Sequence, residues 1–475
     1  MNVKLNNIKH FLCKLTLAVF IVGLIPLPGL HQSKALAFSV GDEKEVGEKL
    51  LSIVRKSFNV YDDPDIVNYI NSLGSRILTV AGHQFFDYHF FVINNSDFNA
   101  FAAPSGLIFI HSGLIEAMSN EGELVSVMAH ECGHVTSRHI SDRIQKTQKT
   151  SMLSAAMLIA GIAIGAGPLT EALVAGSMAG SAAMSLKFSR LDEEEADRLA
   201  YKWMLGMGMD PGPMVSMLNK MHRQSVYLTA NIPPYLLTHP EPKRRMGYVQ
   251  ELIELSEITK TFPARDDFDF LRIKYRIMSK TKSSTTMQAI FGRQATKENV
   301  QESQMAHYGL YLSQLEKADY TNAEESLRKV MTLYPDKNIL TTDLGVLYSK
   351  SNQHEKAFEL FSQAAKNDPD CAYTQYNLAL AHQKRGENDK ALFLYEGLLT
   401  KFPDHARIHY NVGNLKAQMG QQAASHYHLG YYFWLEGTKD NTQYHLNQAK
   451  NQSEDMPTQH LATTLLKKIE RLEKM

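Results

Sequence analysis

The sequence has few cysteines and no excess of charge of either sign. Its 475 residues include only Cys13, Cys132 and Cys371, too few for a disulfide framework. Lysine and arginine total 50, and aspartate and glutamate also total 50, so the formal net charge is zero. Proteins that bind nucleic acid need a basic surface. The balanced charge therefore argues against a nucleic-acid partner.

The sequence also lacks an apolar run of comfortable length for a membrane span. The run from Leu15 to Leu30 contains two prolines and is shorter than the roughly 20 residues that a helix needs to cross a bilayer. Three lysines precede it, and Ala35-Leu36-Ala37 fits an A-x-A cleavage site. We therefore predict a signal peptide, residues 1–37, cut after Ala37, with an uncleaved anchor as the alternative. Its removal leaves 46 basic and 50 acidic residues, a net charge of −4.

The pattern with the clearest chemistry is H-E-x-x-H, spelled His130-Glu131-Cys132-Gly133-His134. Side chains four apart on a helix share one face, so both imidazoles can bind one Zn²⁺. Glu131 would then lie beside the attacking water and could take its proton. Cys132 falls on the far side of the helix, and we interpret it as a packed thiol. Because this short pattern also occurs by chance, the prediction of a zinc site requires a third ligand and further motifs of the same kind of protein.

Two carboxylates downstream are candidates for that third ligand. Glu193 and Asp197 are also four residues apart, so one helix face would present both. One can bind zinc, and the other can accept the N–H of a ligating histidine. The alternative is a solvated acidic first turn of a helix, where carboxylates are common.

These motifs resemble the zinc peptidases related to HtpX and the CAAX prenyl proteases. The family pattern H-E-x-G-H-V is met at residues 130–135, and S-R-x-x-E-x-x-A-D follows at residues 189–197. Residues 99–110 are similar to the family's N-A-F-A-x-P-G-G segment before a strand, with Ser105 where a glycine is usual. The resemblance covers about residues 38–255.

The resemblance implies a role for each residue of the site. His130, His134 and Glu193 would hold one zinc ion, and Glu131 would act as the general base. Asp197 would orient a zinc-binding histidine or, alternatively, assist proton donation. His139 lies five residues after His134, about 140° further around a continuous helix, so we do not expect it to be a ligand.

A further family pattern, T-H-P-x-x-x-x-R, matches Thr238-His239-Pro240 with Arg245. By this resemblance, His239 would fill the fourth position on zinc and hold the site closed, since a zinc site with four protein ligands cannot hydrolyse. Arg245 would stabilise the developing oxyanion once the site opens. The alternative for His239 is a surface histidine in a turn that ends a helix.

The C-terminal third is repetitive. Pro335, Pro369 and Pro403 are spaced 34 residues apart, the period of the tetratricopeptide repeat. At equal offsets ahead of the last two prolines, small residues alternate with bulky ones: Gly345 and Ala379, Ala357 and Ala391, Phe361 and Tyr395. A capping helix is expected near residues 461–474. Candidates for a partner-binding face, which are more often packing residues, are Tyr373, Tyr376, Asn377, Tyr410, Asn411 and Asn414.

The apolar stretch at residues 152–186 is rich in alanine, glycine and methionine and is interrupted by Pro168 and Glu171. Neither half is comfortably long enough to span a bilayer. We expect a helical lid beside the zinc site, or a helix pair that rests on a membrane surface. Two true spans are the third interpretation.

Together these features predict a mainly α protein. A zincin-like α+β metallopeptidase domain at residues 38–265 is followed by a connector at 266–304 and an α-solenoid of tetratricopeptide repeats at 305–475. A short helix at residues 268–276 is expected to dock on the repeats.

The combination resembles periplasmic members of the family that act on outer-membrane β-barrel proteins. It implies a zinc metalloendopeptidase and chaperone, whose repeats bind the barrel-assembly machinery and unfolded outer-membrane proteins. The alternatives are a repeat scaffold with a largely latent protease site and a protease embedded in the membrane. Substrate identity, preferred bond and oligomeric state do not follow from the sequence.

Overall fold

The structure is a computed structural model that describes residues 39–146, 187–227, 233–256, 262–263, 266–296, 300–452 and 455–474. The predicted signal peptide and the apolar stretch at 152–186 lie outside these residues. Within the described ranges, no helix combines the length and the apolar character that a membrane crossing requires.

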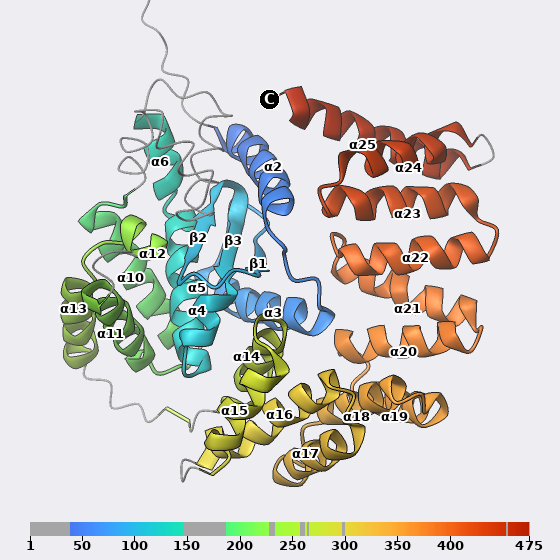
Figure 1. Cartoon of the computed structure of the whole chain (residues 1–475). Coiled ribbons are helices and arrows are strands. Elements are labelled where there is room, and N and C mark those ends of the chain that lie inside the picture. The colour runs from blue at the N-terminus through green and yellow to red at the C-terminus, as the bar shows by residue number, and fades with distance from the viewer. Residues whose placement is uncertain are drawn as a thin grey trace, which may run out of the picture. The chain divides into compact units, whose positions relative to one another are not determined.

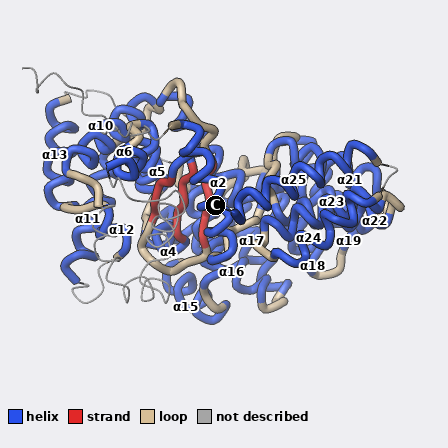
Figure 2. Tube along the Cα trace, turned by 90° about the horizontal axis from the view of Figure 1, so that it is seen from above, coloured by secondary structure: helices blue, strands red, loops and turns tan. Residues whose placement is uncertain are grey.

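A small mixed sheet forms the centre of the predicted peptidase domain (Figures 1 and 2). It comprises β1 (His89–Ile93), β2 (Ala100–Ala103) and β3 (Leu107–His111), in the order β1-β3-β2. β3 pairs parallel with β1 and antiparallel with β2. Every residue of β2 and β3 is buried, as expected for apolar strands that are covered on both faces.

The short turn η1 (Pro104–Gly106) joins β2 to β3 and contains two residues with positive φ. Ser105 has a φ of 72° and Gly106 has a φ of 80°. A left-handed conformation costs a residue with a side chain roughly 1–2 kcal/mol, which explains why a glycine suits the position of Ser105.

Helices surround this sheet and supply the remaining parts of the domain. The predicted α+β arrangement is confirmed. The helices before residue 147 are α2 (Val40–Ser57), α3 (Pro64–Ala81), α4 (Ser112–Ala117), α5 (Glu121–Thr136) and α6 (His139–Lys146). Those that follow residue 186 are α10 (Arg190–Gly206), α11 (Gly212–Tyr227), α12 (Pro234–Thr238) and α13 (Pro242–Leu255).

Helices α5 and α10 pack closely because a glycine lies at their contact. A Cβ atom built on Gly133 would lie 3.0 Å from Cα of Ala196, tighter than ordinary packing allows. Ala196 itself is fully buried. This pair of small residues therefore brings together the two helices that carry the predicted zinc ligands.

The predicted connector is helical. Helix α14 (Phe268–Thr281) includes the short docking helix expected at residues 268–276, and α15 (Ser284–Gln294) follows after a two-residue link. Buried side chains of α14, among them Phe270 and Ile277, belong to one hydrophobic core that includes both Ile108 of the sheet and Leu344 of the repeats. The connector is therefore part of the packing that joins the two domains.

The repeats form successive antiparallel helix pairs, which Figure 1 shows stacked from α16 to α25. Glycines recur where these helices cross: Cβ atoms on Gly345, Gly413 and Gly430 would lie 2.5–2.8 Å from side chains of the next helix. The predicted alternation of small and bulky residues is confirmed. The helices are α16 (Val300–Glu316), α17 (Tyr320–Leu333), α18 (Ile339–Lys350), α19 (His354–Asn367), α20 (Ala372–Lys384), α21 (Asn388–Lys401), α22 (Ala406–Gln418), α23 (Gln422–Leu435), α24 (Lys439–Asn451) and α25 (Met456–Lys474).

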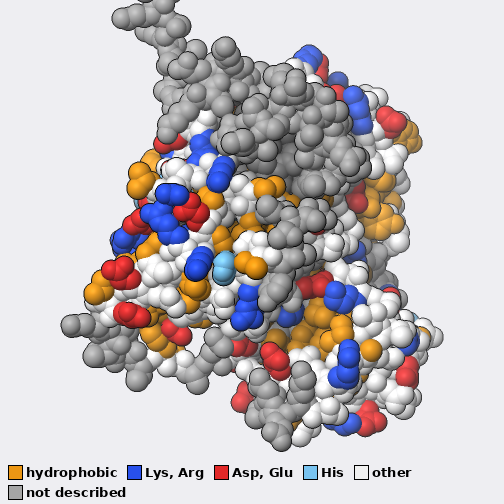
Figure 3. Space-filling view, turned by 60° about the vertical axis from the view of Figure 1, so that its left-hand side comes forward, with side chains coloured by type: hydrophobic (Ala, Val, Ile, Leu, Met, Phe, Trp, Pro, Cys, Tyr) orange, Lys and Arg blue, Asp and Glu red, His pale blue; other side chains and the backbone are white. Residues whose placement is uncertain are grey.

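Charged residues of both signs are interspersed over the described part of the face drawn in Figure 3. The mixture agrees with the balanced composition of the chain.

Candidate metal centre

The two histidines of the H-E-x-x-H motif lie on α5, which Asn120 caps by accepting a hydrogen bond from the Glu123 N–H. Both imidazoles are buried, with Nε2 of His130 3.0 Å from Nε2 of His134. The predicted i, i+4 pair on one helix face is therefore present.

Helix α10 brings the two predicted carboxylates to the same place. Ser189 begins this helix with a capping box, in which its hydroxyl and the Asp192 carboxylate exchange bonds with each other's backbone N–H. Glu193 places Oε1 3.5 Å from Nε2 of His134 and Oε2 3.6 Å from Nε2 of His130. Asp197, one turn later, contacts the opposite edge of His130, with Oδ1 2.8 Å from Nδ1.

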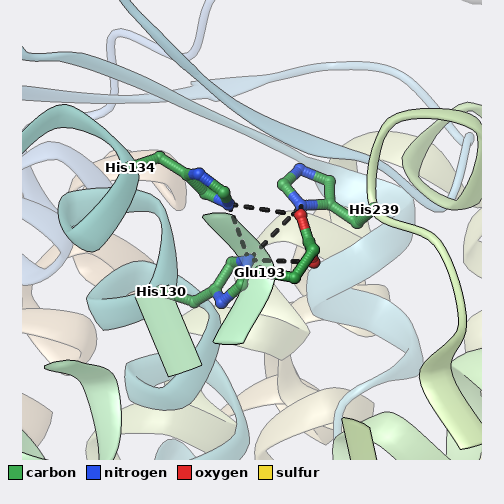
Figure 4. A group of neighbouring side chains, drawn as sticks. All are labelled: His130, His134, Glu193 and His239. Atoms are coloured by element: carbon green, nitrogen blue, oxygen red, sulfur yellow. Dashed lines mark hydrogen bonds and ion pairs between the residues drawn. The ribbon is translucent and has the colours of Figure 1, made fainter. Parts of the chain in front are cut away.

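His239 closes the fourth side of this arrangement. It follows α12 directly and is 1% exposed. Its Nδ1 lies 3.0 Å from Oε1 of Glu193 and 3.3 Å from Nε2 of His130. Figure 4 shows the four side chains His130, His134, Glu193 and His239 pointing toward one another.

This donor set fits zinc. Each of the four residues offers one ligand atom, and all four atoms lie within 4.8 Å of one another. Ligands about 2.0–2.2 Å from a tetrahedral Zn²⁺ are roughly 3.3 Å apart. Nε2 of His130 lies at a similar distance from Nε2 of His134, 3.0 Å, and from Nδ1 of His239, 3.3 Å. Among the described residues, no other group of three or more histidine, cysteine, aspartate or glutamate side chains meets the same criterion.

Glu131 lies beside this set and is fully buried. Its Oε2 accepts a hydrogen bond from the Ala102 N–H of β2 at 2.9 Å. Its Oε1 lies 3.2 Å from the Tyr235 hydroxyl, which donates to it, and 3.6 Å from Nε2 of His239. The sheet and α12 therefore both hold the carboxylate next to the four donors.

Comparison with known proteins agrees with this geometry. Residues 66–253 match Peptidase family M48, and residues 348–419 match the tetratricopeptide repeat. The chain is 30% identical over 333 residues to the β-barrel assembly-enhancing protease of Escherichia coli (strain K12), covering 69% of this chain and 68% of that protein. It is also 30% identical over 372 residues to the protein of the same name from Yersinia pestis, covering 76% of this chain and 74% of that one.

The chain belongs to the family of the β-barrel assembly-enhancing proteases. It is a zinc metalloendopeptidase of the M48 type with tetratricopeptide repeats. A more distant relative, a mitochondrial metalloendopeptidase of Schizosaccharomyces pombe, is 26% identical over 192 residues, covering 40% of this chain and 54% of that protein.

In this member of the assembly-enhancing protease family, Arg245 contacts two carboxylates. Its Nη1 lies 2.6 Å from Oε2 of Glu193, and its Nε and Nη2 form a forked pair with Asp197 at 2.8 Å each. Nη2 also lies 3.3 Å from Nδ1 of His130. The guanidinium is 4% exposed, so it neutralises buried charge directly behind the donor set.

These contacts set the charge states of the site. Burial raises the pKa of the Glu193 carboxyl, but Arg245 and His239 outweigh burial and hold that pKa well below its ordinary value. Burial likewise raises the pKa of the Asp197 carboxyl. Arg245 and His130 lower this pKa by more, so that it lies below its ordinary value. Burial lowers the pKa of His134 well below its usual range, which favours the neutral imidazole that binds metals.

Two residues of the site were missed by sequence reasoning. Tyr235 stacks its ring on His239 with centroids 4.2 Å apart, besides donating to Glu131. Its spacing of four from His239 was a usable signal, since such a pair shares one side of a helical turn. Phe188 stacks on His134 with centroids 3.8 Å apart, and no local pattern pointed to it.

His139 lies closer to His134 than the sequence predicts. An angle of about 140° between the two residues holds only on a continuous helix. Helix α5 instead ends at Thr136, Arg138 has a φ of 56°, and α6 begins at His139. The turn brings Nδ1 of His139 to 2.9 Å from Nδ1 of His134. His139 is not one of the four donors.

Cys132 is a free, fully buried thiol, and burial raises its pKa well above the ordinary value. A neutral thiol in an apolar setting is a packing residue, as predicted.

Proposed function

We propose that this chain is a periplasmic zinc metalloendopeptidase and chaperone that assists the assembly of outer-membrane β-barrel proteins and degrades those that stall or misfold. The observation that carries the enzymatic part is the convergence of four metal donors beside Glu131. The β-barrel substrates are proposed from the names of the relatives and from the repeats that accompany the peptidase domain.

In this proposal, His130, His134 and Glu193 are the zinc ligands of the active enzyme. Bound zinc supplies Lewis acidity, which makes water more acidic and polarises the scissile carbonyl. Glu131 takes a proton from the attacking water and passes it to the leaving amine. The backbone N–H of Ala102, which donates to Oε2 of Glu131, keeps this carboxylate aimed at the site.

Asp197 and Arg245 support that set from behind. Asp197 accepts the Nδ1–H of His130, which fixes the ring tautomer and leaves Nε2 free as a ligand. Arg245 compensates the charge of Asp197 and Glu193. Its predicted role at the oxyanion requires the guanidinium to leave at least part of these contacts, so that role belongs to the opened site.

His239 is proposed to be a latch. A zinc site with four protein ligands is closed, and His239 would complete such a set through its Nδ1, which lies 3.0 Å from Oε1 of Glu193. Helix α12, which directly precedes His239, also carries Tyr235, whose hydroxyl donates a hydrogen bond to the general base Glu131. Displacement of α12 would therefore release both the fourth ligand position and Glu131.

The latch is tested by comparing His239→Ala with the parent in a proteolysis assay. We expect faster cleavage, including self-cleavage, with zinc retained, whereas Arg245→Ala should be slower with zinc retained. The matched control is His222→Ala, a partly exposed histidine of α11. If His239→Ala is no more active than the parent and its zinc site is unaltered, the latch is wrong.

The enzyme is distinguished from a scaffold with a largely latent protease site by one comparison. An unfolded outer-membrane β-barrel protein is incubated with the zinc-loaded parent and with Glu131→Gln. We expect the parent to cleave it about 10²–10⁴ times faster, the usual contribution of general-base catalysis. Equal cleavage by the two proteins would remove Glu131 as the base, and no cleavage by either would favour the scaffold.

The repeats are proposed to recruit the barrel-assembly machinery or its substrates. A cleft of about 950 Å³ lies between β1 and α3 of the peptidase domain and the repeats around α22 and α23. Its lining mixes aromatic and charged residues, including Phe91, Asp62, Asp404 and Glu436. Such a lining suits an unfolded polypeptide, which presents both apolar and charged side chains.

A photo-crosslinking residue placed at His89, which is exposed and lines the cleft, tests this surface. We expect an adduct with an unfolded β-barrel protein, and no adduct from the exposed control position Glu254 of α13. Equal adducts from both positions would show that the cleft is not the binding surface. Deletion of residues 305–475 is a poorer test, because it would remove Asp343 from the buried Arg272.

The periplasmic location is proposed from the N-terminal pattern. Sequencing of the mature protein should give Phe38 as the first residue, as cleavage after Ala37 requires. Residues 152–186 are proposed to act as a lid or to touch a membrane surface. Release of the protein by a carbonate wash is expected in both cases, whereas retention would indicate an embedded protease.

A further inference from the structure

His134 has an orienting partner of a different kind from that of His130. Nε2 of His134 faces the metal donors, and its Nδ1 faces away from them, 2.9 Å from Nδ1 of His139. His139 is 6% exposed. Its other nitrogen, Nε2, lies 3.3 Å from Oε2 of Glu195 on α10. The three side chains therefore form a continuous line from the donor set to the surface.

Only one placement of protons satisfies every contact in this line. A histidine that binds a metal through Nε2 carries its proton on Nδ1. The Nδ1–H of His134 must then donate to Nδ1 of His139, which has to be an unprotonated acceptor. The proton of His139 consequently sits on Nε2 and is donated to the carboxylate of Glu195. If His134 binds the metal through Nε2, the other neutral tautomer of His139 cannot accept the Nδ1–H of His134.

Neighbouring groups hold this line in place. Oε1 of Glu195 accepts a hydrogen bond from the Ser137 hydroxyl at 2.9 Å, which fixes the carboxylate at the outer end. Phe188 stacks on the face of the His134 ring, so the ring is restrained both on its face and at its edge. Arg138 has a left-handed backbone conformation, and the turn that it forms places His139 next to the end of α5.

The arrangement around His130 provides the comparison. There a buried carboxylate, Asp197, meets Nδ1 directly at 2.8 Å. In the case of His134, the carboxylate is half-exposed and acts through an interposed imidazole. Partners of both kinds raise the basicity of a ligating histidine and fix its orientation.

We infer that His139 and Glu195 are positioning residues that orient His134 through a hydrogen-bonded relay and strengthen its bond to the metal. This inference rests on the proposed function, in which His134 is a zinc ligand. It assigns a role to His139, which is not one of the four donors.

The test measures metal binding rather than catalysis alone. Zinc affinity is determined by competition with a chelator for the full-length parent, His139→Phe, His139→Asn and Glu195→Gln. The visible absorption of the Co²⁺-substituted proteins reports the ligand field directly. Phenylalanine keeps a ring of similar size without an acceptor, and asparagine places an amide oxygen near the position of Nδ1. The control is His83→Phe, because His83 is exposed.

We expect His139→Phe to bind zinc about 10–100-fold more weakly and to change the Co²⁺ spectrum. His139→Asn should recover most of the affinity, Glu195→Gln should lose less than His139→Phe, and His83→Phe should match the parent. Parental affinity and spectrum in His139→Phe would overturn the inference. Equal losses in the phenylalanine and asparagine variants would also overturn it, since they would indicate a packing role.

The relay and the proposed function can be contradicted by different results. If the parent binds zinc, cleaves its substrate and is insensitive to His139→Phe, only the relay is wrong. If the parent does not bind zinc at His134, the proposed function is wrong and the relay is wrong with it.

Discussion

Among the residues that the structure describes, two clusters of largely buried charged side chains can be compared, and they differ in which side chains converge. The metal-site cluster comprises His130, Glu131, His134, Glu193, Asp197, His239 and Arg245. The junction cluster comprises Asp63, Asp65, Arg272, Arg276 and Asp343, where α3 and α14 meet the first repeats. Both contain arginine–carboxylate pairs that are withdrawn from water.

In the junction cluster the arginine and aspartate side chains form ion pairs with one another. Arg272 lies 2.6 Å from Asp65 and 3.0 Å from Asp343, and Arg276 lies 2.8 Å from Asp63. The hydroxyls of Tyr308 and Tyr373 donate to the Asp343 carboxylate at 3.1 Å each. The cluster contains no histidine. Tyr373, a candidate for the partner-binding face, is thereby shown to be a buried part of this junction.

In the metal-site cluster the arginine and Asp197 neutralise one side, while ligand atoms of three imidazoles and one carboxylate converge on the other. Burial of charge alone therefore does not mark a functional site. The distinguishing feature is the convergence of four possible ligand atoms within 4.8 Å of one another, an arrangement that suits a metal ion.

The largest effect is expected for His134→Ala. Removal of one imidazole from the donor set should abolish stoichiometric zinc binding and proteolysis, while urea unfolding of the repeats stays unchanged. Metal analysis by mass spectrometry and the proteolysis assay measure this, with exposed His83→Ala as the matched control. Stoichiometric zinc in His134→Ala would remove this residue from the ligand set.

Arg272→Met should affect stability and leave zinc content unchanged. It removes the charge at similar volume and leaves Asp65 and Asp343 buried without their main partner. Breaking a buried pair in this way costs about 3–5 kcal/mol, measurable as a lower midpoint in urea. The same substitution at exposed Arg293 should stay within about 0.5 kcal/mol.

The double variant Arg272→Met with Asp343→Leu sharpens this result. Replacing both members of a buried pair by apolar residues is often neutral, so part of the lost stability should return. A double variant less stable than the sum of both single changes would contradict the interpretation of the junction cluster as mutually compensating charges.

A smaller effect is expected for Asp197→Asn. The amide keeps the shape of the side chain but loses the charge that orients His130 and pairs with Arg245. Zinc affinity or kcat/KM should fall by about 10–100-fold. Unchanged values for both quantities would exclude the orienting role and the proton-donating alternative alike.

The smallest effect concerns His405, a buried histidine outside both clusters. It is 4% exposed, and neither ring nitrogen has a hydrogen-bond partner within the described part of the chain. Burial lowers its pKa to about 4, an effect that Asp62 and Asp63 oppose and that Arg407 and His409 reinforce.

Because the folded pKa of His405 lies below its ordinary value of 6.5, the unfolded chain binds more protons between these two values. Stability should therefore fall as pH decreases through 6.5, by roughly 1 kcal/mol between pH 7.5 and pH 6. The variant His405→Asn should show a flatter pH dependence of the free energy of unfolding than His83→Asn. Identical slopes would remove His405 as the cause.

The two i, i+4 pairs of the site were predictable because their information is local, whereas His239 was indicated only by the family pattern at residues 238–245. His130 and His134, like Glu193 and Asp197, are each spaced by one helical turn, and the structure preserves both pairs on α5 and α10. The repeats were predictable for a related reason, since a fixed 34-residue period survives differences in individual side chains.

Other features depend on chain reversals and distant contacts. The position of His139 depends on the left-handed turn at Arg138, which no sequence pattern predicts. The junction cluster joins Asp65 to Arg272 and Arg272 to Asp343 across long stretches of chain. For such pairs only the folded packing of helices against helices determines which charges meet.

The most direct test of the central claim is an anomalous-scattering measurement at the zinc absorption edge on crystals of the zinc-loaded protein. We predict one zinc peak per chain, bounded by Nε2 of His130, Nε2 of His134, a carboxylate oxygen of Glu193 and Nδ1 of His239. A zinc peak at any other group of side chains, with none among these four, would contradict the account.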